Sequence, residues 1–278
     1  MLAAPERPLV YGRQGGSPPR SFELLSISAD GAAQYVAANP WPAQPPFDEI
    51  GEYTTAIDAQ ALTDLVNLAM GLAGDHDGGA PSRDAGIEYV EAWSPDRGAT
   101  LEWNPLAPSP HAMAFIHAVR GVVAAARTEP VSVVRASLEL EGGGERAAVV
   151  LAAEGRQPFR LAERGVSGSA MAAGAGDIEV RTRVTESSEW TDPSAIPAAL
   201  VHAPPVSFDV GVGSPGPHGK VELPLGESAR FTVPIPEGAR LLSRGRLEAL
   251  VRLAYPMRSL TGEFYVQEGW LLPDPIQS

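Results

Sequence analysis

The spacing of hydrophobic residues changes near residue 128 of this 278-residue chain. Before that point, two segments repeat their apolar residues every three or four positions, which is typical of amphipathic helices. After it, apolar residues alternate with polar ones, which is typical of strands with one buried face. The pattern predicts two domains: an α+β domain over residues 1–128 and an all-β domain over residues 131–278.

Short apolar runs predict an antiparallel sheet in the first domain. Strands are expected at residues 8–13, 21–27, 33–37 and 52–57. A hairpin is expected from residues 87–93 and 99–103, because Pro95-Asp96-Arg97-Gly98 between them is rich in turn residues. Together with two helices, this order of elements predicts one antiparallel sheet with the helices on one face.

Both helices carry start signals. Asp58 can cap a helix that ends at Gly74, and Ser109-Pro110 supplies an N-cap and a first-turn proline for a helix that runs to about Arg127. The first helix is expected to bury Leu62, Leu65, Val66, Ala69 and Leu72. The second is expected to bury Met113, Ile116, Val119 and Val123.

The second domain has a hydrophobic period of two. Val134, Ala136 and Leu138 alternate with polar residues, and similar runs recur up to residue 270 with Gly- and Pro-rich segments between them. This pattern predicts a β-sandwich of roughly seven to nine strands, for which an Ig-like fold is the first expectation.

Composition excludes several classes of protein. The chain has no cysteine, which excludes disulfides, thiolate nucleophiles and cysteine-based metal sites. Its 21 basic and 34 acidic residues give a net charge of −13, so a nucleic-acid partner is not expected. No run approaches the ~18 apolar residues of a membrane span, and residues 1–8 lack the basic start and apolar run of a signal peptide. We therefore expect a cytoplasmic protein without a membrane partner.

No motif in the sequence predicts catalysis or a cofactor. Residues 211–216 fit G-x-G-x-x-G, but a strand pattern follows them, whereas a dinucleotide site needs a helix N-terminus there. Ser167 lies between glycines, but position 169 is serine where a nucleophile elbow requires glycine. We expect a protein that is not an enzyme and uses no cofactor.

A metal site is one alternative. Asp75 and Asp77 follow the helix-ending Gly74, and with Asp84 they could supply oxygen ligands to a cation. Aspartate and glycine are also favoured in turns without any ligand. A metal-dependent or small-molecule-binding function at residues 75–84 therefore stays open as an alternative.

Two tryptophans are candidate binding anchors. Trp41 lies between Pro40 and Pro42 in a stiff proline-rich loop, and Trp190 lies outside any periodic segment. Rigid exposed rings lose little entropy when they dock onto a partner. The same rings could instead cap the core of their own domain. Three further tryptophans fall in or at the ends of strands and are expected in core or interdomain packing: Trp93, Trp103 and Trp270.

Residues 8–105 resemble the small α+β proteins of the emfourin type. The resemblance is carried by the strand end Arg13-Gln14-Gly15-Gly16 and by the order of strands, helix 59–73 and strand 87–93. Some proteins of this type inhibit thermolysin-like proteases, so the resemblance implies a fold for the first domain and points to inhibition as one function. The loop at residues 40–46 and the whole second domain have no place in that pattern.

These observations favour a non-enzymatic protein-binding or assembly module that recognises a protein partner, with self-association as a further possibility. One alternative is a metalloprotease inhibitor acting through the first domain. Another is the metal-dependent or small-molecule-binding protein with its site at residues 75–84.

Overall fold

The computed structural model divides the chain into two compact units. Unit 1 comprises Met1–Trp41 and Glu52–Val131, and unit 2 comprises Pro42–Gly51 and Ser132–Ser278. The structure describes residues 7–15, 21–39, 49–72, 86–94, 97–104, 108–141, 146–162, 179–185, 201–202, 220–234, 246–258, 264–271 and 276–277. Within these residues, no helix is long and apolar enough to cross a membrane.

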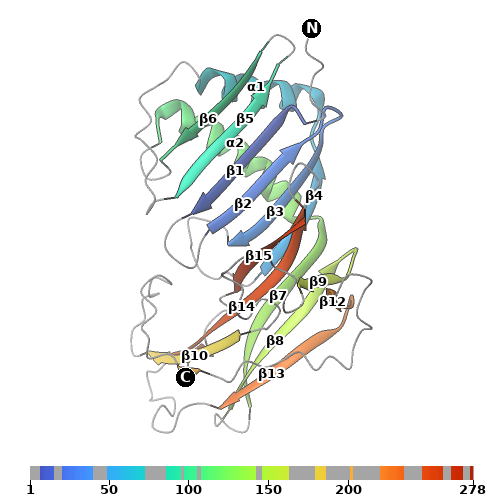
Figure 1. The fold of residues 1–278 in the computed structure, drawn as a ribbon, viewed down its shortest axis with the longest axis vertical. Helices are drawn as coiled ribbons and strands as arrows, with labels where there is room; N and C mark the ends of the chain where they lie inside the picture. The colour runs from blue at the N-terminus through green and yellow to red at the C-terminus, as the bar shows by residue number, and fades with distance from the viewer. Residues whose placement is uncertain are drawn as a thin grey trace. The chain divides into compact units, whose positions relative to one another are not determined.

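Unit 1 is a mixed α+β unit built on a sheet whose hydrogen-bonded order is β4-β3-β2-β1-β5-β6. The strands are β1 (Leu9–Gly15), β2 (Ser21–Ile27), β3 (Ala32–Asn39), β4 (Glu49–Ala56), β5 (Ile87–Trp93) and β6 (Gly98–Trp103). Neighbours from β3 to β6 pair antiparallel. Two helices, α1 and α2, cover one face of this sheet (Figure 1). The expected antiparallel sheet with two helices is confirmed.

Helix α1 (Ala59–Leu72) begins where the sequence predicts. The carboxylate of Asp58 accepts a hydrogen bond from the amide of Ala61 at 2.7 Å, which satisfies one of the free amides at the helix start. All five residues expected inside are buried, and Met70 joins them. The helix packs its apolar face against α2 and β5.

Helix α2 (Pro110–Arg127) has the predicted cap, with the Ser109 hydroxyl accepting from the amide of Ala112 at 3.1 Å. The predicted burial of Met113 is wrong, because 53% of this residue is exposed. The helix is rotated so that Phe115 points inward, where its ring packs edge-on against Tyr11 at 5.9 Å and Trp103 at 6.3 Å. The buried stripe is Ala112, Phe115, Ile116, Val119, Val122 and Ala126.

A tight turn joins β2 and β3. Gly31 has φ +87°, its amide donates to the carbonyl of Ser28, and its carbonyl accepts from the amide of Ile57 at 3.0 Å. A Cβ at this position would collide with the carbonyl oxygen of Ile57. The turn therefore requires glycine both for its backbone angle and for the close approach of the two chains.

The described strands of unit 2 form three groups. The long hairpin of β7 (Pro130–Glu141) and β8 (Arg146–Gly155) continues to β13 (Ser228–Pro234) in the order β13-β8-β7. β9 (Phe159–Ala162) pairs with β12 (Lys220–Leu223). The third group has the order β11-β10-β14-β15, with β16 also on β14. Its strands are β10 (Glu179–Thr185), β11 (Val201–His202), β14 (Arg246–Arg258), β15 (Phe264–Leu271) and β16 (Ile276–Gln277).

Candidate functional site

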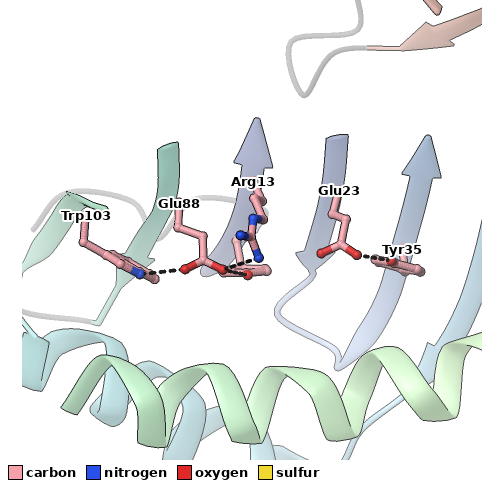
Figure 2. Close-up of polar contacts among 6 residues, drawn as sticks. Arg13, Glu23, Tyr35, Glu88 and Trp103 are labelled. Atoms are coloured by element: carbon pink, nitrogen blue, oxygen red, sulfur yellow. Dashed lines mark hydrogen bonds and ion pairs between the residues drawn. The ribbon is translucent and has the colours of Figure 1, made fainter. Parts of the chain in front are cut away.

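A row of polar side chains crosses five strands of unit 1, from β6 to β3, on the face that the helices cover. In the strand register, Trp103 of β6 lies opposite Glu88 of β5, Glu88 opposite Arg13 of β1, and Arg13 opposite Glu23 of β2. Figure 2 shows these side chains extending from their strands toward the helices. The row occupies positions where the alternation of the strands calls for core residues.

Glu88 is the centre of the row. It is 2% exposed, and its Oε1 accepts hydrogen bonds from the Tyr11 hydroxyl at 2.7 Å and from Arg13 Nη1 at 3.3 Å. Its Oε2 accepts a hydrogen bond from Trp103 Nε1 at 2.7 Å. Three donors and one opposite charge therefore compensate the buried carboxylate, as a buried anion requires.

The groups around Glu88 are adapted to its charge. Arg13 is 4% exposed, and burial lowers the pKa of its guanidinium while the charge of Glu88 opposes this effect. Burial, and then the charge of Glu88, raises the pKa of the Tyr11 phenol far above its ordinary value. At neutral pH Tyr11 therefore keeps its proton and donates a hydrogen bond to the carboxylate, and Arg13 stays charged beside it.

Glu23 and Tyr35 form the other end of the row. The hydroxyl of Tyr35 donates to Glu23 Oε1 at 3.0 Å, and the guanidinium of Arg127 lies 5.9 Å from the centre of the Tyr35 ring. Burial raises the pKa of Glu23, against the Tyr35 hydrogen bond and the positive charges of Arg13 and Arg127. Burial also raises the pKa of Tyr35, so this phenol remains a donor.

The contacts of the row join neighbouring strands. The carboxylate of Glu88 in β5 accepts hydrogen bonds from Tyr11 and Arg13 of β1 and from Trp103 of β6. A slip of the β5–β6 hairpin by one residue against β1 would carry Glu88 to the opposite face of the sheet and break its hydrogen bonds to Tyr11 and Arg13. The row therefore fixes the register of the β5–β6 hairpin against β1.

The other face of this hairpin is partly exposed to solvent. Trp93 is 39% exposed, so a core position for it is wrong, whereas Trp103 is buried in the core as expected. The ring of Trp93 lies over Gly98, its partner across the hairpin, where any Cβ would collide with it. At the turn, the amide of Ser94 donates to the carbonyl of Arg97 at 2.8 Å.

β6 is an edge strand. Among the residues the structure describes, β5 is its only strand partner. Gly98, Thr100 and Glu102, which point away from the helices, are all exposed. An edge strand presents backbone donors and acceptors to which another strand can add. Within the described part of the chain, the hairpin thus combines an edge strand with an exposed aromatic ring.

The residues that the sequence nominated as sites lie outside the described residues. This holds for the binding candidates Pro40, Trp41, Pro42 and Trp190, and for the metal candidates Asp75, Asp77 and Asp84. Within the described residues, no group of three or more His, Cys, Asp or Glu side chains is placed to hold a metal ion.

The sequence analysis did not single out the polar row. Its signal was present, because Arg13, Glu23 and Glu88 each stand at a core position of a strand whose neighbouring core positions are apolar. A charged residue at a core position of a strand needs a polar or oppositely charged partner. Three strands with such residues in one domain therefore predict that the charged side chains contact one another.

Comparison with known proteins gives no match among family models, curated proteins or solved structures. The resemblance to emfourin-type proteins therefore stays a prediction, and any functional proposal depends on the geometry of the chain itself.

Proposed function

We propose that this chain is a non-enzymatic protein-binding module that recognises its partner through the β5–β6 hairpin of unit 1. The observation that carries the proposal is the solvent-exposed edge strand β6 beside Trp93, of which 39% is exposed. Large aromatic residues at the surface are enriched among the residues that dominate binding energy. Open strand edges are a recurrent docking site for extended peptides.

The buried polar row supports this proposal because it makes the edge rigid. The indole of Trp103, in β6, is bonded to Glu88, and Glu88 is bonded in turn to β1 through Tyr11 and Arg13. A strand held in one register loses little conformational entropy when a partner docks onto it. The same fixed geometry holds the Trp93 ring against Gly98.

Unit 2 enters the proposal as a scaffold with an Ig-like β-sandwich fold. Support comes from the alternating sequence pattern and from the described strands of unit 2, among which β11, β10, β14 and β15 form one sheet. The binding role expected for Trp41 and Trp190 stays a prediction.

Affinity purification from a lysate of the native host tests the proposed function. The tagged wild type is compared with Trp93→Ala and with the control Met113→Ala, which removes a similarly exposed apolar side chain on α2. We expect a stoichiometric partner with the wild type and with Met113→Ala that is lost with Trp93→Ala. A partner retained equally by all three proteins would remove the hairpin from the proposal.

A further inference from the structure

We propose that the partner segment is an extended, basic stretch of polypeptide that adds to β6 as a further strand. This inference rests on the proposed function and names the chemistry of the partner. It follows from three properties of the hairpin: the open edge of β6, the acidic side chains on its outer face, and the position of Trp93.

The outer face of the hairpin is defined by its cross-strand pairs. Trp93 lies opposite Gly98, Glu91 opposite Thr100, and Tyr89 opposite Glu102. A strand added to β6 would place alternate side chains beside Gly98, Thr100 and Glu102, on the same face as Glu91 and Trp93. Alternate side chains of the added strand would therefore contact this face, and its chemistry would select among them.

The charge of that face is negative. Glu102 is exposed and Glu91 is partly exposed, and none of the described cationic side chains forms an ion pair with either of them. The charge of Glu91, after burial, contributes to raising the pKa of Tyr89, which lies two residues away on the same face of β5. Opposite charges across a strand pair stabilise it and like charges destabilise it, so the face selects basic side chains.

The exposed cation of the hairpin, Arg97, lies at the turn. Arg97 and Glu102 therefore lie toward opposite ends of β6. An incoming strand is expected to carry its basic residues beside Thr100 and Glu102. An arginine on that strand could also reach the face of Trp93, since aromatic rings attract guanidinium groups.

The net charge of −13 argues against a second copy of this chain as the occupant, because two such chains repel each other. A basic segment is instead attracted by the negative charge of this chain, which favours its binding at the edge strand and speeds its approach.

The direct test uses the whole chain and a synthetic seven-residue peptide that alternates arginine and valine. As a strand, this peptide presents all its arginines on one face. Its control replaces each valine with proline, which keeps the charge but removes the backbone donors that a strand ladder needs. Binding is measured by calorimetry at moderate salt. We expect the valine peptide to bind at least tenfold more tightly than the proline peptide.

Variants then locate the binding. Glu102→Lys and Trp93→Ala are each expected to weaken binding of the valine peptide at least tenfold, whereas Met113→Ala leaves it unchanged. A thermal melt of each variant confirms that it is folded. Equal affinity for the two peptides would show attraction to net charge alone and would overturn the proposal. The proposal would also be overturned if the wild type did not bind the valine peptide, or if Glu102→Lys bound it as tightly as the wild type.

The two proposals fail separately. If Trp93→Ala loses its cellular partner but the valine peptide does not bind, the hairpin is an interface for a partner of different chemistry. If the lysate experiment shows no dependence on Trp93, the proposed function itself is wrong.

Discussion

Replacement of Glu88 by glutamine is the sharpest perturbation of the buried polar row, because it keeps the shape of the side chain and removes its charge. The amide retains one oxygen acceptor, so its NH2 group must face one of the three donors that now meet the carboxylate. Arg13, 4% exposed, then loses the carboxylate to which its Nη1 donates at 3.3 Å, while the charge of Glu23 still favours its charged form.

The expected cost follows from these contacts. Removing one partner of a buried ion pair costs up to about 3–5 kcal/mol, because the charge that stays inside loses part of its compensation. For a protein of this size, each kcal/mol lowers Tm by roughly 2–4 °C, so we expect a decrease on the order of 10 °C. Trp103→Phe breaks a single hydrogen bond to the carboxylate and should cost less, about 1.5–3 kcal/mol.

Urea denaturation followed by circular dichroism provides the assay, with a double-mutant cycle as its control. Arg13→Met combined with Glu88→Gln removes both charges, so the double variant should be less destabilised than the sum of the single variants by at least about 2 kcal/mol. Additive effects, or a cost below about 1 kcal/mol for Glu88→Gln, would refute the argument that the row holds the hairpin in register.

Three further predictions concern other parts of unit 1. Gly31→Ala should destabilise the chain by about 1–3 kcal/mol, because alanine disfavours the left-handed backbone angle of Gly31 and its Cβ would collide with the carbonyl of Ile57. Gly121→Ala, on the open face of α2, should stabilise the chain by up to ~1 kcal/mol. Equal effects of the two substitutions in urea denaturation would contradict this prediction. Burial raises the pKa of Glu23 in the native state. At pH values above the unfolded pKa of about 4.3 and below the native pKa, the native state therefore binds more protons than the unfolded state. The contribution of Glu23 to stability falls as pH rises through this range. The unfolding free energy of Glu23→Gln should therefore increase relative to that of the wild type as pH rises from 4 to 7. A constant difference between the two would refute the raised pKa of Glu23. Burial raises the pKa of the Tyr11 phenol, so above pH ~10 this phenol should lower the stability of the chain by about 1.4 kcal/mol per pH unit. The unfolding free energy of Tyr11→Phe should therefore fall less steeply with pH in this range. Identical slopes for the two proteins would contradict the burial of this phenol.

Much of unit 1 followed from local signals in the sequence. The caps at Asp58 and Ser109 and the strands of the β5–β6 hairpin agree with the structure because each depends on a few neighbouring residues. The rotation of α2 did not follow from its periodicity. Two apolar stripes, one residue apart, fit its sequence, and the inward position of Phe115 depends on Tyr11 and Trp103, which come from distant strands.

The binding surface was harder to predict for the same reason. Trp93 and Trp103 both lie at strand ends in the sequence, and only strand phase separates them: Trp103 faces the helices beside Glu88, whereas Trp93 lies on the opposite face over Gly98. The edge position of β6 depends on the strand order of the whole sheet, which no local pattern contains.

Amide hydrogen exchange of the whole chain, with and without the arginine–valine peptide, tests the central claim most directly. Strand addition predicts slower exchange in β6 (Gly98–Trp103), because its outward amides gain partners, with no change in α1. Protection elsewhere, or unchanged exchange in β6 at saturating peptide, would contradict binding through this edge.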